Sequence, residues 1–469
     1  MNEVVNYGFI SILPSLIAVI LAFITRNTLI SLGLACFIGV FLSGQGIFGF
    51  PNLLKHSVGT SSFAWVMLLN TLIAILVAFF RKTGAMQGFT KLIENKNPSR
   101  KMLKVIAWIL GIFVYFSDSF SPLFVGTVMR DLTDKAKISR EKLSYIADSG
   151  AAPVSVLVPI TGWAAFLSGL AVGIANIDSV EKGLNLFVKA IPFNLYALIT
   201  VIFVGLISAE IIPDFGPMKK AEKRSLETGK VIREDGEPML GKELTEMPKF
   251  PNIKTRVFLN FILPVILIIT FAIGTYILKG SAKTMEAFLY VMILMIGSML
   301  IQKVPLKEIT DTMLDGIKGS VPAVSILAMA YSLNSLSKEL GTASYIVEHT
   351  KNFMTPHTLP AIIFLIAAII AFATGSSWGT FAIAMPIALP LAFQFSNGEI
   401  TLLVLACFSA VAGGGVFGDH CSPLSDTTIL ASTGAGSDHI DHVKTQLPYA
   451  LICGGLSLII YLIIGFTML

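Results

Sequence analysis

The sequence predicts an all-α polytopic membrane protein, and three observations support this prediction. First, 54% of the 469 residues are hydrophobic and only 13% are charged, whereas soluble domains carry about 25% charged residues. Second, the hydrophobic residues form long runs, and the mean hydropathy is +0.78. Third, Gly, Pro and Ser interrupt several of these runs. We therefore expect roughly 11–13 hydrophobic helices and half-helices, in two structural repeats with broken or re-entrant helices.

The hydrophobic runs fall into two groups on either side of a polar interval. Several are shorter than the roughly 20 residues that a full crossing needs, so we expect some of them to be half-helices or re-entrant segments. In chain order the runs are Gly8–Thr25, Leu29–Ile47, Phe63–Phe80, Leu103–Met129, Ala151–Ile174, Ala190–Ile212, Val257–Leu278, Ala287–Ile301, Val321–Leu336, Leu359–Thr374, Phe381–Phe395, Leu402–Val416 and Leu447–Met468.

The polar interval from Pro213 to Arg256 predicts the domain organisation. It contains ten Lys or Arg and eight Asp or Glu residues, and it is too short for a substantial core of its own. We expect residues 1–212 to form the N-terminal repeat half, 213–256 a charged cytoplasmic linker, and 257–469 the C-terminal half. The net charge of +5 is spread over loops, which is the usual positive-inside pattern and indicates no nucleic-acid partner.

An internal repeat links the two halves. The segment FSDSFSPLFVGTVMR, which ends at Arg130, parallels ATGSSWGTFAIAMP, which ends at Pro386, because each is an apolar helix broken by a Ser-rich turn. Basic clusters flank the run Leu103–Met129 on both sides. If both clusters are cytoplasmic, this run enters the membrane and returns, with its bend at Asp118–Pro122. Paired interrupted helices are the best sequence indication of a transporter's central site.

The stretch GGGVFGDHCSPLSDTT, residues 413–428, is the most informative part of the chain. Gly and Pro break helices, and an ionised carboxylate at mid-membrane costs roughly 2.5–3.5 kcal/mol. Broken backbone beside buried acids is typical of a site for a small cation, because Na⁺ prefers several oxygen ligands. We predict that Asp419 and Asp426 bind Na⁺ and H⁺ in turn. Ser422, Thr427 and Thr428 would supply further oxygens.

Two acids of the first half, Asp118 and Asp148, are further candidates for ion or proton binding. Asp148 lies in ADSGAAPVSV, which parallels GDHCSPLSDT around Asp419; capping of a helix N-terminus is the alternative. His420 could sense pH, orient Asp419 or simply pack. The string SDHIDH, residues 437–442, has the composition of a metal cluster, but we interpret it as a solvated connection.

The Ser-rich turns predict a place for an organic substrate. Their hydroxyls and the half-helix N-termini would bind a cation or a carboxylate, and the alternative is helix packing through small residues. The candidate substrate-binding residues are Ser376, Ser377, Ser119, Ser121, Trp163 and Asn334. The strings that match GxGxxG follow no strand, so nucleotide binding is excluded. Without an ATP-binding motif, we expect transport to use ion gradients.

The motif GDHCSPLSDTTILASTGAGSDHIDHVKTQLPYAL closely resembles the NhaC-type Na⁺/H⁺ antiporters, as do ATGSSWGTFAIAMPIALPLA and SREKLSYIADSGAAPVSVLVPITGW. The resemblance implies a secondary transporter of the cell inner membrane, built from two inverted structural repeats, that exchanges Na⁺ for H⁺ by alternating access. The alternative is a Na⁺-coupled carrier or exchanger of a small organic acid, of the malate/lactate type, or of an amino acid. We expect no enzymatic activity and no cofactor, with Na⁺ as the transported ion. The sequence is compatible with a monomer and with a homodimer.

Overall fold

The fold comes from a computed structural model. It describes residues 7–25, 27–94, 97–115, 118–159, 161–239, 249–250, 253–279, 283–342, 345, 348–349 and 354–467. The regular elements in this part of the chain are helices, and the only β-type pairing is an isolated bridge between Pro238 and Asp438. The predicted all-α membrane fold is therefore confirmed.

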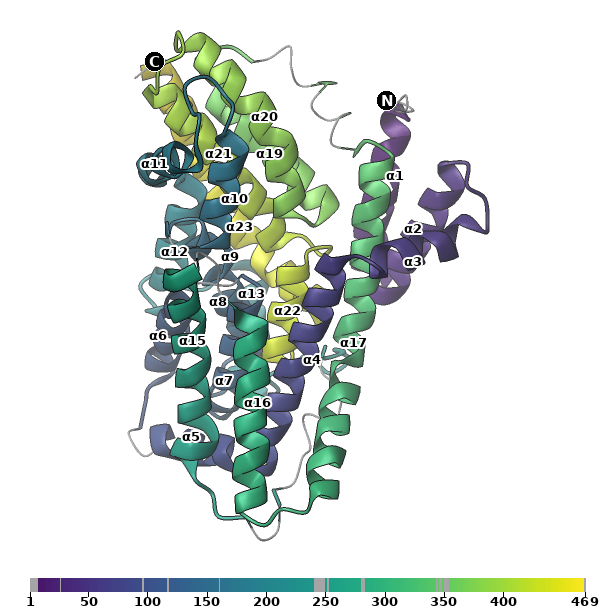
Figure 1. Cartoon of the computed structure of the whole chain (residues 1–469), viewed down its shortest axis with the longest axis vertical. Coiled ribbons are helices and arrows are strands. Elements are labelled where there is room, and N and C mark those ends of the chain that lie inside the picture. The colour runs from purple at the N-terminus through teal and green to yellow at the C-terminus, as the bar shows by residue number, and fades with distance from the viewer. Residues whose placement is uncertain are drawn as a thin grey trace.

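The first half and the linker contain η1 (Gly8–Ile12), α1 (Leu13–Thr25), α2 (Thr28–Leu42), α3 (Gly49–Val58), α4 (Ser61–Lys82), α5 (Ala85–Glu94), α6 (Arg100–Phe113), α7 (Phe120–Lys135), α8 (Arg140–Ser149), α9 (Ala152–Ser155), α10 (Gly162–Ala171), α11 (Val180–Ala190), η2 (Ile191–Phe193), α12 (Leu195–Ser208) and α13 (Gly216–Thr228). The second half contains η3 (Phe258–Ile262), α15 (Leu263–Lys279), α16 (Thr284–Ile301), α17 (Leu306–Glu339), α19 (Leu359–Thr374), α20 (Ser377–Phe395), α21 (Leu402–Cys421), α22 (Asp426–Ala435) and α23 (His439–Thr467) (Figure 1).

Several of these helices can span a membrane. By length and composition, five helices within the described residues are long and apolar enough, or up to seven if two bent pairs each count as one span. The bent pairs are Val180–Phe193 with Leu195–Ser208, and Leu306–Pro322 with Val324–Glu339. Four further apolar helices are shorter, with 10–17 residues. Full spans therefore alternate with shorter and broken pieces, as the lengths of the apolar runs predict.

The run Leu103–Met129 folds back on itself. Helix α6 ends at Phe113 and α7 begins at Phe120. Arg100, at the start of α6, donates a hydrogen bond to the carbonyl of Lys137, just beyond the end of α7 (3.0 Å). The two ends of the segment therefore meet, so the chain reverses direction within it, and entry and return on one side of the membrane stays a prediction. The bend lies between Phe113 and Phe120 and includes Asp118.

Helices α19 and α20 form a corresponding hairpin in the second half. Gly375 ends α19 in the left-handed conformation (φ +64°), and the hydroxyl of Ser376 caps α20 by accepting from the N–H of Gly379 (3.2 Å). Helix α21 then runs parallel to α19, since Gly414 lies against Phe364–Ala368 and Gly418 against Ala371–Phe372. The α6–α7 hairpin lies in the lower part of the molecule and the α19–α20 hairpin in the upper part (Figure 1). The two hairpins therefore lie at different heights in the molecule, and the inverted relation of the two repeats stays a prediction.

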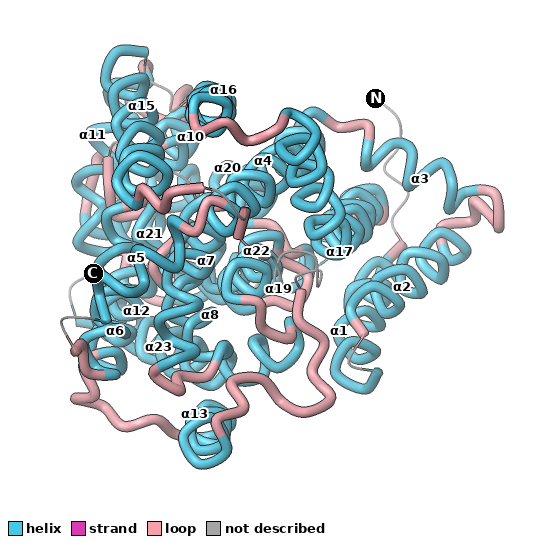
Figure 2. The backbone as a smooth tube through the Cα atoms, turned by 90° about the horizontal axis from the view of Figure 1, so that it is seen from below, coloured by secondary structure: helices cyan, strands magenta, loops and turns pink. Residues whose placement is uncertain are grey.

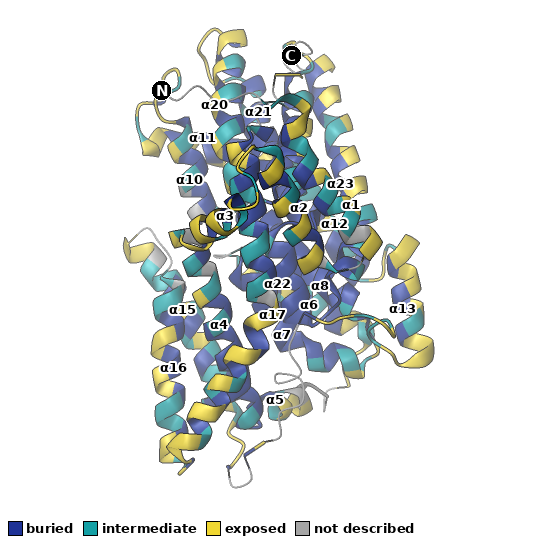
Figure 3. Cartoon of the chain, turned by 90° about the vertical axis from the view of Figure 1, so that its right-hand side faces the viewer, coloured by how far each residue is buried: buried dark blue, intermediate teal, exposed yellow. Residues whose placement is uncertain are grey.

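A third break separates α21 from α22, and α22 lies at the centre of the bundle. It contacts α7, α8, α17, α21 and α23, and seen from below it lies well inside the outer helices (Figure 2). The helices around it are mostly buried, whereas α3, α15 and α16 expose much of their surface (Figure 3). The break after α21 is therefore placed where the two halves meet.

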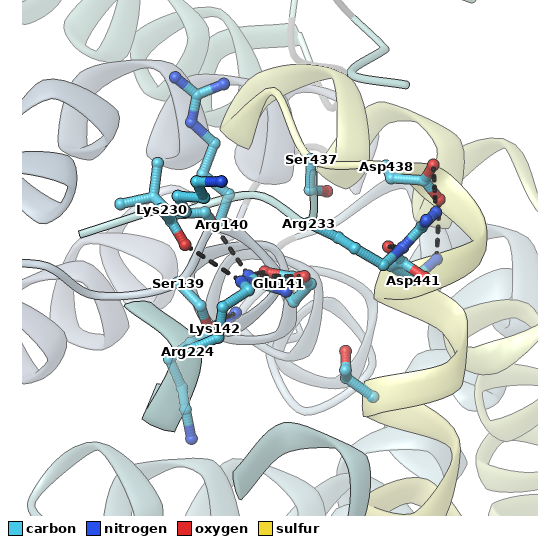
Figure 4. A network of polar contacts seen from close by, with 12 residues as sticks. Ser139, Arg140, Glu141, Lys142, Arg224, Lys230, Arg233, Ser437, Asp438 and Asp441 are labelled. Carbon is cyan, nitrogen blue, oxygen red and sulfur yellow. Dashed lines mark hydrogen bonds and ion pairs between the residues drawn. The ribbon is translucent and has the colours of Figure 1, made fainter. Parts of the chain in front are cut away.

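The linker is docked on the helices rather than extended away from them. Arg224 of α13 binds both carboxylate oxygens of Glu141 (3.0 and 2.9 Å) at the start of α8. Arg233 binds Asp441 (2.8 Å) at the start of α23 and lies 3.8 Å from Asp438 (Figure 4). The hydrogen bond to Asp441 and the nearby carboxylates raise the pKa of Arg233. The linker thereby connects a helix of each half.

The string SDHIDH is not the solvated connection that we expect from its composition. His439 and His442 are 2% and 0% exposed, and Asp438 is 4% exposed. His439 donates to or accepts from Ser432 and contacts the carbonyl of Pro423 (both 3.0 Å), while Asp438 accepts the backbone N–H of Glu237 from the linker (2.9 Å). Tertiary hydrogen bonds replace water around these polar groups, which the local sequence does not reveal.

Candidate functional site

A cavity of about 630 Å³ lies where the broken helices converge. The α6–α7 bend contributes Asp118 and Ser119, the α19–α20 turn contributes residues 375–379, and the α21–α22 break contributes Leu424 and Asp426. The remaining walls are the start of α4 and the segment 330–338 of α17. Among the lining residues Lys338 and Trp378 are exposed, whereas Ser119 and Ser377 are 5% and 1% exposed. Asp419, which is 1% exposed, does not line the cavity and lies behind Ser377.

Asp419 lies in the last turn of α21 and is held by two hydroxyls from different breaks. Ser377, at the start of α20, donates to one carboxylate oxygen (3.0 Å), and Ser425, which caps α22, donates to the other (2.6 Å). Thr427 extends this set through Ser425, with the two hydroxyl oxygens 3.0 Å apart. A buried carboxylate surrounded by hydroxyls has the oxygen-rich environment that a hard cation requires.

Asp426 and Asp118 face the cavity from opposite repeats. Asp426 is the first residue of α22, where the helix dipole favours a negative charge, and it accepts a hydrogen bond from the Tyr331 hydroxyl (3.3 Å). Asp118 accepts from the indole N–H of Trp163 (2.9 Å) and from the backbone N–H of Ser119 (2.8 Å). Asp426 interacts electrostatically with both Asp118 and Asp419. Asp118 and Asp426 thus line one cavity, and Asp419 lies behind its Ser377 wall.

Other predicted oxygen ligands have different partners. The Ser422 hydroxyl donates to the carbonyl of Phe372 in α19 (2.7 Å) and accepts from the N–H of Leu424 (3.1 Å). The Thr428 hydroxyl donates to the backbone carbonyl of Asp419 (3.0 Å). Both residues therefore hold the α21–α22 break in shape, and their hydroxyls point to backbone groups rather than to the carboxylates.

The predicted substrate residues are divided between the cavity and its supports. Ser119, Ser376, Ser377 and Asn334 line the cavity. Trp163 lies behind it and binds Asp118, and its ring packs edge-on against Trp378 (centroids 5.7 Å apart). Ser121 is buried, and its hydroxyl lies 3.5 Å from the carbonyl of Gly111, away from the cavity.

Asp148 and His420 belong to a second, fully buried polar cluster. Asp148 accepts from Gln446 (2.8 Å) and lies 3.3 Å from the Nε2 of His442. His420 contacts Ser149 (2.9 Å) and Tyr196 (2.8 Å) through its two ring nitrogens. Asp148 lies near the C-terminal end of α8, so the alternative that it caps a helix N-terminus is wrong. None of these residues lines the cavity.

A polar stripe on α17 is part of the site but is absent from our sequence-based candidates, apart from Asn334. Tyr331, Asn334, Ser335 and Lys338 all line the cavity. Their spacing, i, i+3, i+4 and i+7, places them on one face of a helix. This pattern inside the run Val321–Leu336 and just beyond it is the signal that could have identified them.

The arrangement suits binding of a hard cation or a proton, and of an organic solute, better than it suits catalysis. Within the described residues no group of three or more His, Cys, Asp or Glu side chains is placed to hold a metal ion, so SDHIDH does not form a metal cluster of that kind. A cation at Asp419 and Asp426 would instead combine carboxylate oxygens with the hydroxyls of Ser377, Ser425 and Thr427.

Comparison with known proteins identifies the family of this chain. Residues 155–466 match the Na⁺/H⁺ antiporter family. An uncharacterized protein of Haemophilus influenzae is 33% identical over 97% of this chain and 91% of its own length. The arginine/ornithine antiporter ArcD of Halobacterium salinarum is 32% identical over 33% of this chain and 32% of its own. The Na⁺/H⁺ antiporter NhaC of Alkalihalophilus pseudofirmus is 27% identical over 34% and 33%.

The matched segment contains two of the three breaks, α19–α20 and α21–α22, and therefore Asp419, Asp426 and Ser377. The resemblance found in the sequence motifs is thus confirmed over most of the chain. This multi-pass membrane protein is a secondary antiporter and not an enzyme, and it belongs to the Na⁺/H⁺ antiporter family.

Proposed function

We propose that this antiporter exchanges Na⁺ for H⁺ across the cell inner membrane by alternating access, with Asp419 and Asp426 as the shared ion site. The observation that carries the proposal is the convergence of three breaks on three interacting carboxylates. Charges of the same sign must be compensated when they lie close together and one of them, Asp419, is buried away from water. Either a Na⁺ ion or a proton supplies the missing positive charge, and one excludes the other.

The hydroxyls explain how one site can serve both ions. When the carboxylate of Asp419 is ionised and no cation is bound, Ser377 and Ser425 donate to it. When Na⁺ binds, these hydroxyls can rotate so that their oxygen lone pairs face the cation. When Asp419 is protonated, it becomes a donor itself and needs no cation. The site thus remains hydrogen-bonded in each state, which keeps the cost of burying it low.

The one-sided opening of the cavity supports alternating access. An ion at Asp426 reaches water through the mouth beside Lys338 and Trp378. On the other side, the described residues of α22 beyond Asp426 are buried. Release to that side requires α22 to move relative to α7 and α8, which pack against it. The broken helices provide natural hinges for such a movement.

Proteoliposomes provide the test. A proton gradient is imposed across vesicles that contain the full chain, and Na⁺ is added with no organic solute present. We expect Na⁺ to dissipate the gradient and Asp419→Asn to abolish this effect. Asp178→Asn, at an exposed position in an exposed salt bridge, is the matched control and should behave as wild type. Equal dissipation by choline, or full activity of the Asp419→Asn variant, would overturn the proposal.

A second function, exchange of an organic acid or an amino acid, is favoured by the cavity itself. Its volume of about 630 Å³ lies in the range of small-molecule sites, roughly 300–1,000 Å³. One relative is named an arginine/ornithine antiporter, and another, from Bacillus subtilis, a malate-2H⁺/Na⁺-lactate antiporter. These names concern cations and anions respectively, so the chemistry of the walls must distinguish between them.

A further inference from the structure

A second, much smaller cavity of about 20 Å³ lies away from the ion site, between α4, α7, α17 and α22. Thr433 in its wall comes about two helical turns after Asp426 on α22. None of the described residues that line this cavity is acidic. It therefore differs from the large cavity, because its walls contain no carboxylate that could hold Na⁺.

The guanidinium group of Arg130, in α7, is a buried charge at this small cavity. Arg130 is 1% exposed, and its Nη1 and Nη2 atoms have no hydrogen-bond partner in the part of the chain that the structure describes. Its Nε atom lies 4.0 Å from a carboxylate oxygen of Asp131, which is too far for a hydrogen bond. A buried cation whose donors have no acceptor is strongly unfavourable, so Arg130 needs a negatively charged partner.

The charged neighbours of Arg130 are paired with one another. Arg81, Asp131, Arg140 and Asp134 are the ionised side chains that act on it most strongly. Arg81 binds Asp131 (3.0 Å), and Arg140 binds Asp134 through two hydrogen bonds (3.2 and 2.9 Å). Each pair has no net charge, so the group as a whole has a charge of +1. A ligand that neutralises it must carry a charge of −1.

Asn70 of α4 supplies a further donor to the cavity. It is 2% exposed, and its amide nitrogen Nδ2 has no hydrogen-bond partner among the described residues. The hydroxyls of Ser320 and Thr433 donate instead to backbone carbonyls of their own helices (2.7 and 2.8 Å). The donors that lack an acceptor are thus guanidinium and amide N–H groups, which are suited to an anion.

We propose that Arg130 and Asn70 bind a single monovalent inorganic anion of about the size of chloride. The volume of about 20 Å³ exceeds the roughly 10–15 Å³ that one water molecule needs. It is far below the roughly 300 Å³ at which small-molecule sites begin, so an organic acid is excluded by its size.

The anion would lie at an interface between the two halves of the chain. Its donors belong to α4 and α7, whereas α17 and α22 form the opposite walls. A bound anion would therefore stabilise the packing of α22 in this conformation. Its binding does not depend on the Na⁺/H⁺ exchange proposed above.

Thermal unfolding of the purified full chain in detergent tests the proposal. Choline chloride replaces choline gluconate at constant ionic strength and without Na⁺, because gluconate is too large for the cavity. We expect chloride, up to about 100 mM, to raise the Tm by about 2 °C or more in a saturable way, because a ligand that binds only the folded chain stabilises it. Bromide should act similarly. The same Tm in chloride and in gluconate, as water alone in the cavity predicts, would overturn the proposal.

Two substitutions assign the chloride response to this cavity. Asn70→Asp places a carboxylate beside the guanidinium group in place of the anion, with almost no change in side-chain size. We expect its Tm to be the same in both salts and, in gluconate, no lower than that of the wild type. Arg130→Met removes the charge and should also remove the response. Arg256→Met, at an exposed arginine, is the matched control and should respond as wild type does. A full chloride response in Asn70→Asp or Arg130→Met, or a lower Tm of Asn70→Asp in gluconate, would contradict the proposal.

Discussion

Adjacent residues of α21 serve two different clusters. The Asp419 side chain turns to Ser377 and Ser425, while His420 turns to Ser149 and Tyr196. Successive residues of a helix point about 100° apart, and these two side chains have no hydrogen-bond partner in common. Asp419 and His420 are adjacent in the sequence, but the helix directs their side chains to different clusters. His420 is therefore a member of the Asp148 cluster and not a partner of the Asp419 carboxylate.

The Asp148 cluster yields a prediction about stability. Asp148 is 0% exposed and its carboxylate accepts a hydrogen bond from the side-chain amide of Gln446. In Asp148→Asn, an amide N–H group or a neutral, weaker acceptor would face this donor. We expect a loss of about 1–3 kcal/mol in the free energy of unfolding, measured by denaturant unfolding in detergent. Asp178→Asn, at an exposed position, should change it by less than about 0.5 kcal/mol.

The same variant separates two roles for Asp148. A structural role predicts lower stability with Na⁺/H⁺ exchange retained in the molecules that fold. Unchanged stability together with loss of exchange would contradict that role and would assign Asp148 to the ion path, as the parallel between ADSGAAPVSV and GDHCSPLSDT predicts.

At the scale of elements, glycines fix where the two repeats meet. A Cβ on Gly434 of α22 would lie 2.6 Å from the carbonyl oxygen of Leu123 and 2.8 Å from that of Pro122, both in α7. Real Cβ atoms do not approach backbone so closely, and backbone cannot move aside as a flexible side chain can. The close contact of α7 with α22 holds Asp118 and Asp426 on the same cavity.

This contact predicts opposite effects for two Gly→Ala substitutions. Gly434→Ala should lower the free energy of unfolding by about 1–3 kcal/mol through overpacking and should reduce transport. Gly297→Ala, on α16, meets open space and should stabilise the protein by up to about 1 kcal/mol through helix propensity. Thermal unfolding of both variants measures the difference. If Gly434→Ala proves as stable as Gly297→Ala, the close packing of α7 on α22 is wrong.

The elements themselves were largely predictable, because their signals are local. Gly375 and Ser376 mark the α19–α20 turn, and the Asp118–Pro122 segment marks the bend before α7. The contacts between breaks were not predictable, because they depend on tertiary packing. The local sequence does not indicate that the Ser377 hydroxyl donates to the Asp419 carboxylate, 42 residues away. Nor does it indicate that the Ser422 hydroxyl donates to the backbone carbonyl of Phe372. The α17 stripe of Tyr331 and Lys338 has a helical period, but only the fold shows what it faces.

At the scale of the whole molecule, the two halves are interlocked rather than side by side. Helix α22 of the second half packs against α7 and α8 of the first, and α17 packs against α4. The linker adds ion pairs to helices of both halves through Arg224 and Arg233. The division at residues 212 and 256 remains a prediction about repeats. Movement between access states must therefore rearrange interfaces within this interlocked bundle.

The central claim, that Na⁺ and H⁺ compete for the Asp419–Asp426 site, is tested most directly by the affinity for Na⁺ as a function of pH. Isothermal titration calorimetry of the purified chain with NaCl, at pH values from about 6 to 9, gives the apparent Kd. One-for-one competition predicts that the apparent Kd rises by up to about tenfold for each unit by which pH falls below the pKa of the site, and that Asp419→Asn removes the binding. A Kd that is the same at every pH, or Na⁺ binding by Asp419→Asn that equals wild type, would contradict the claim.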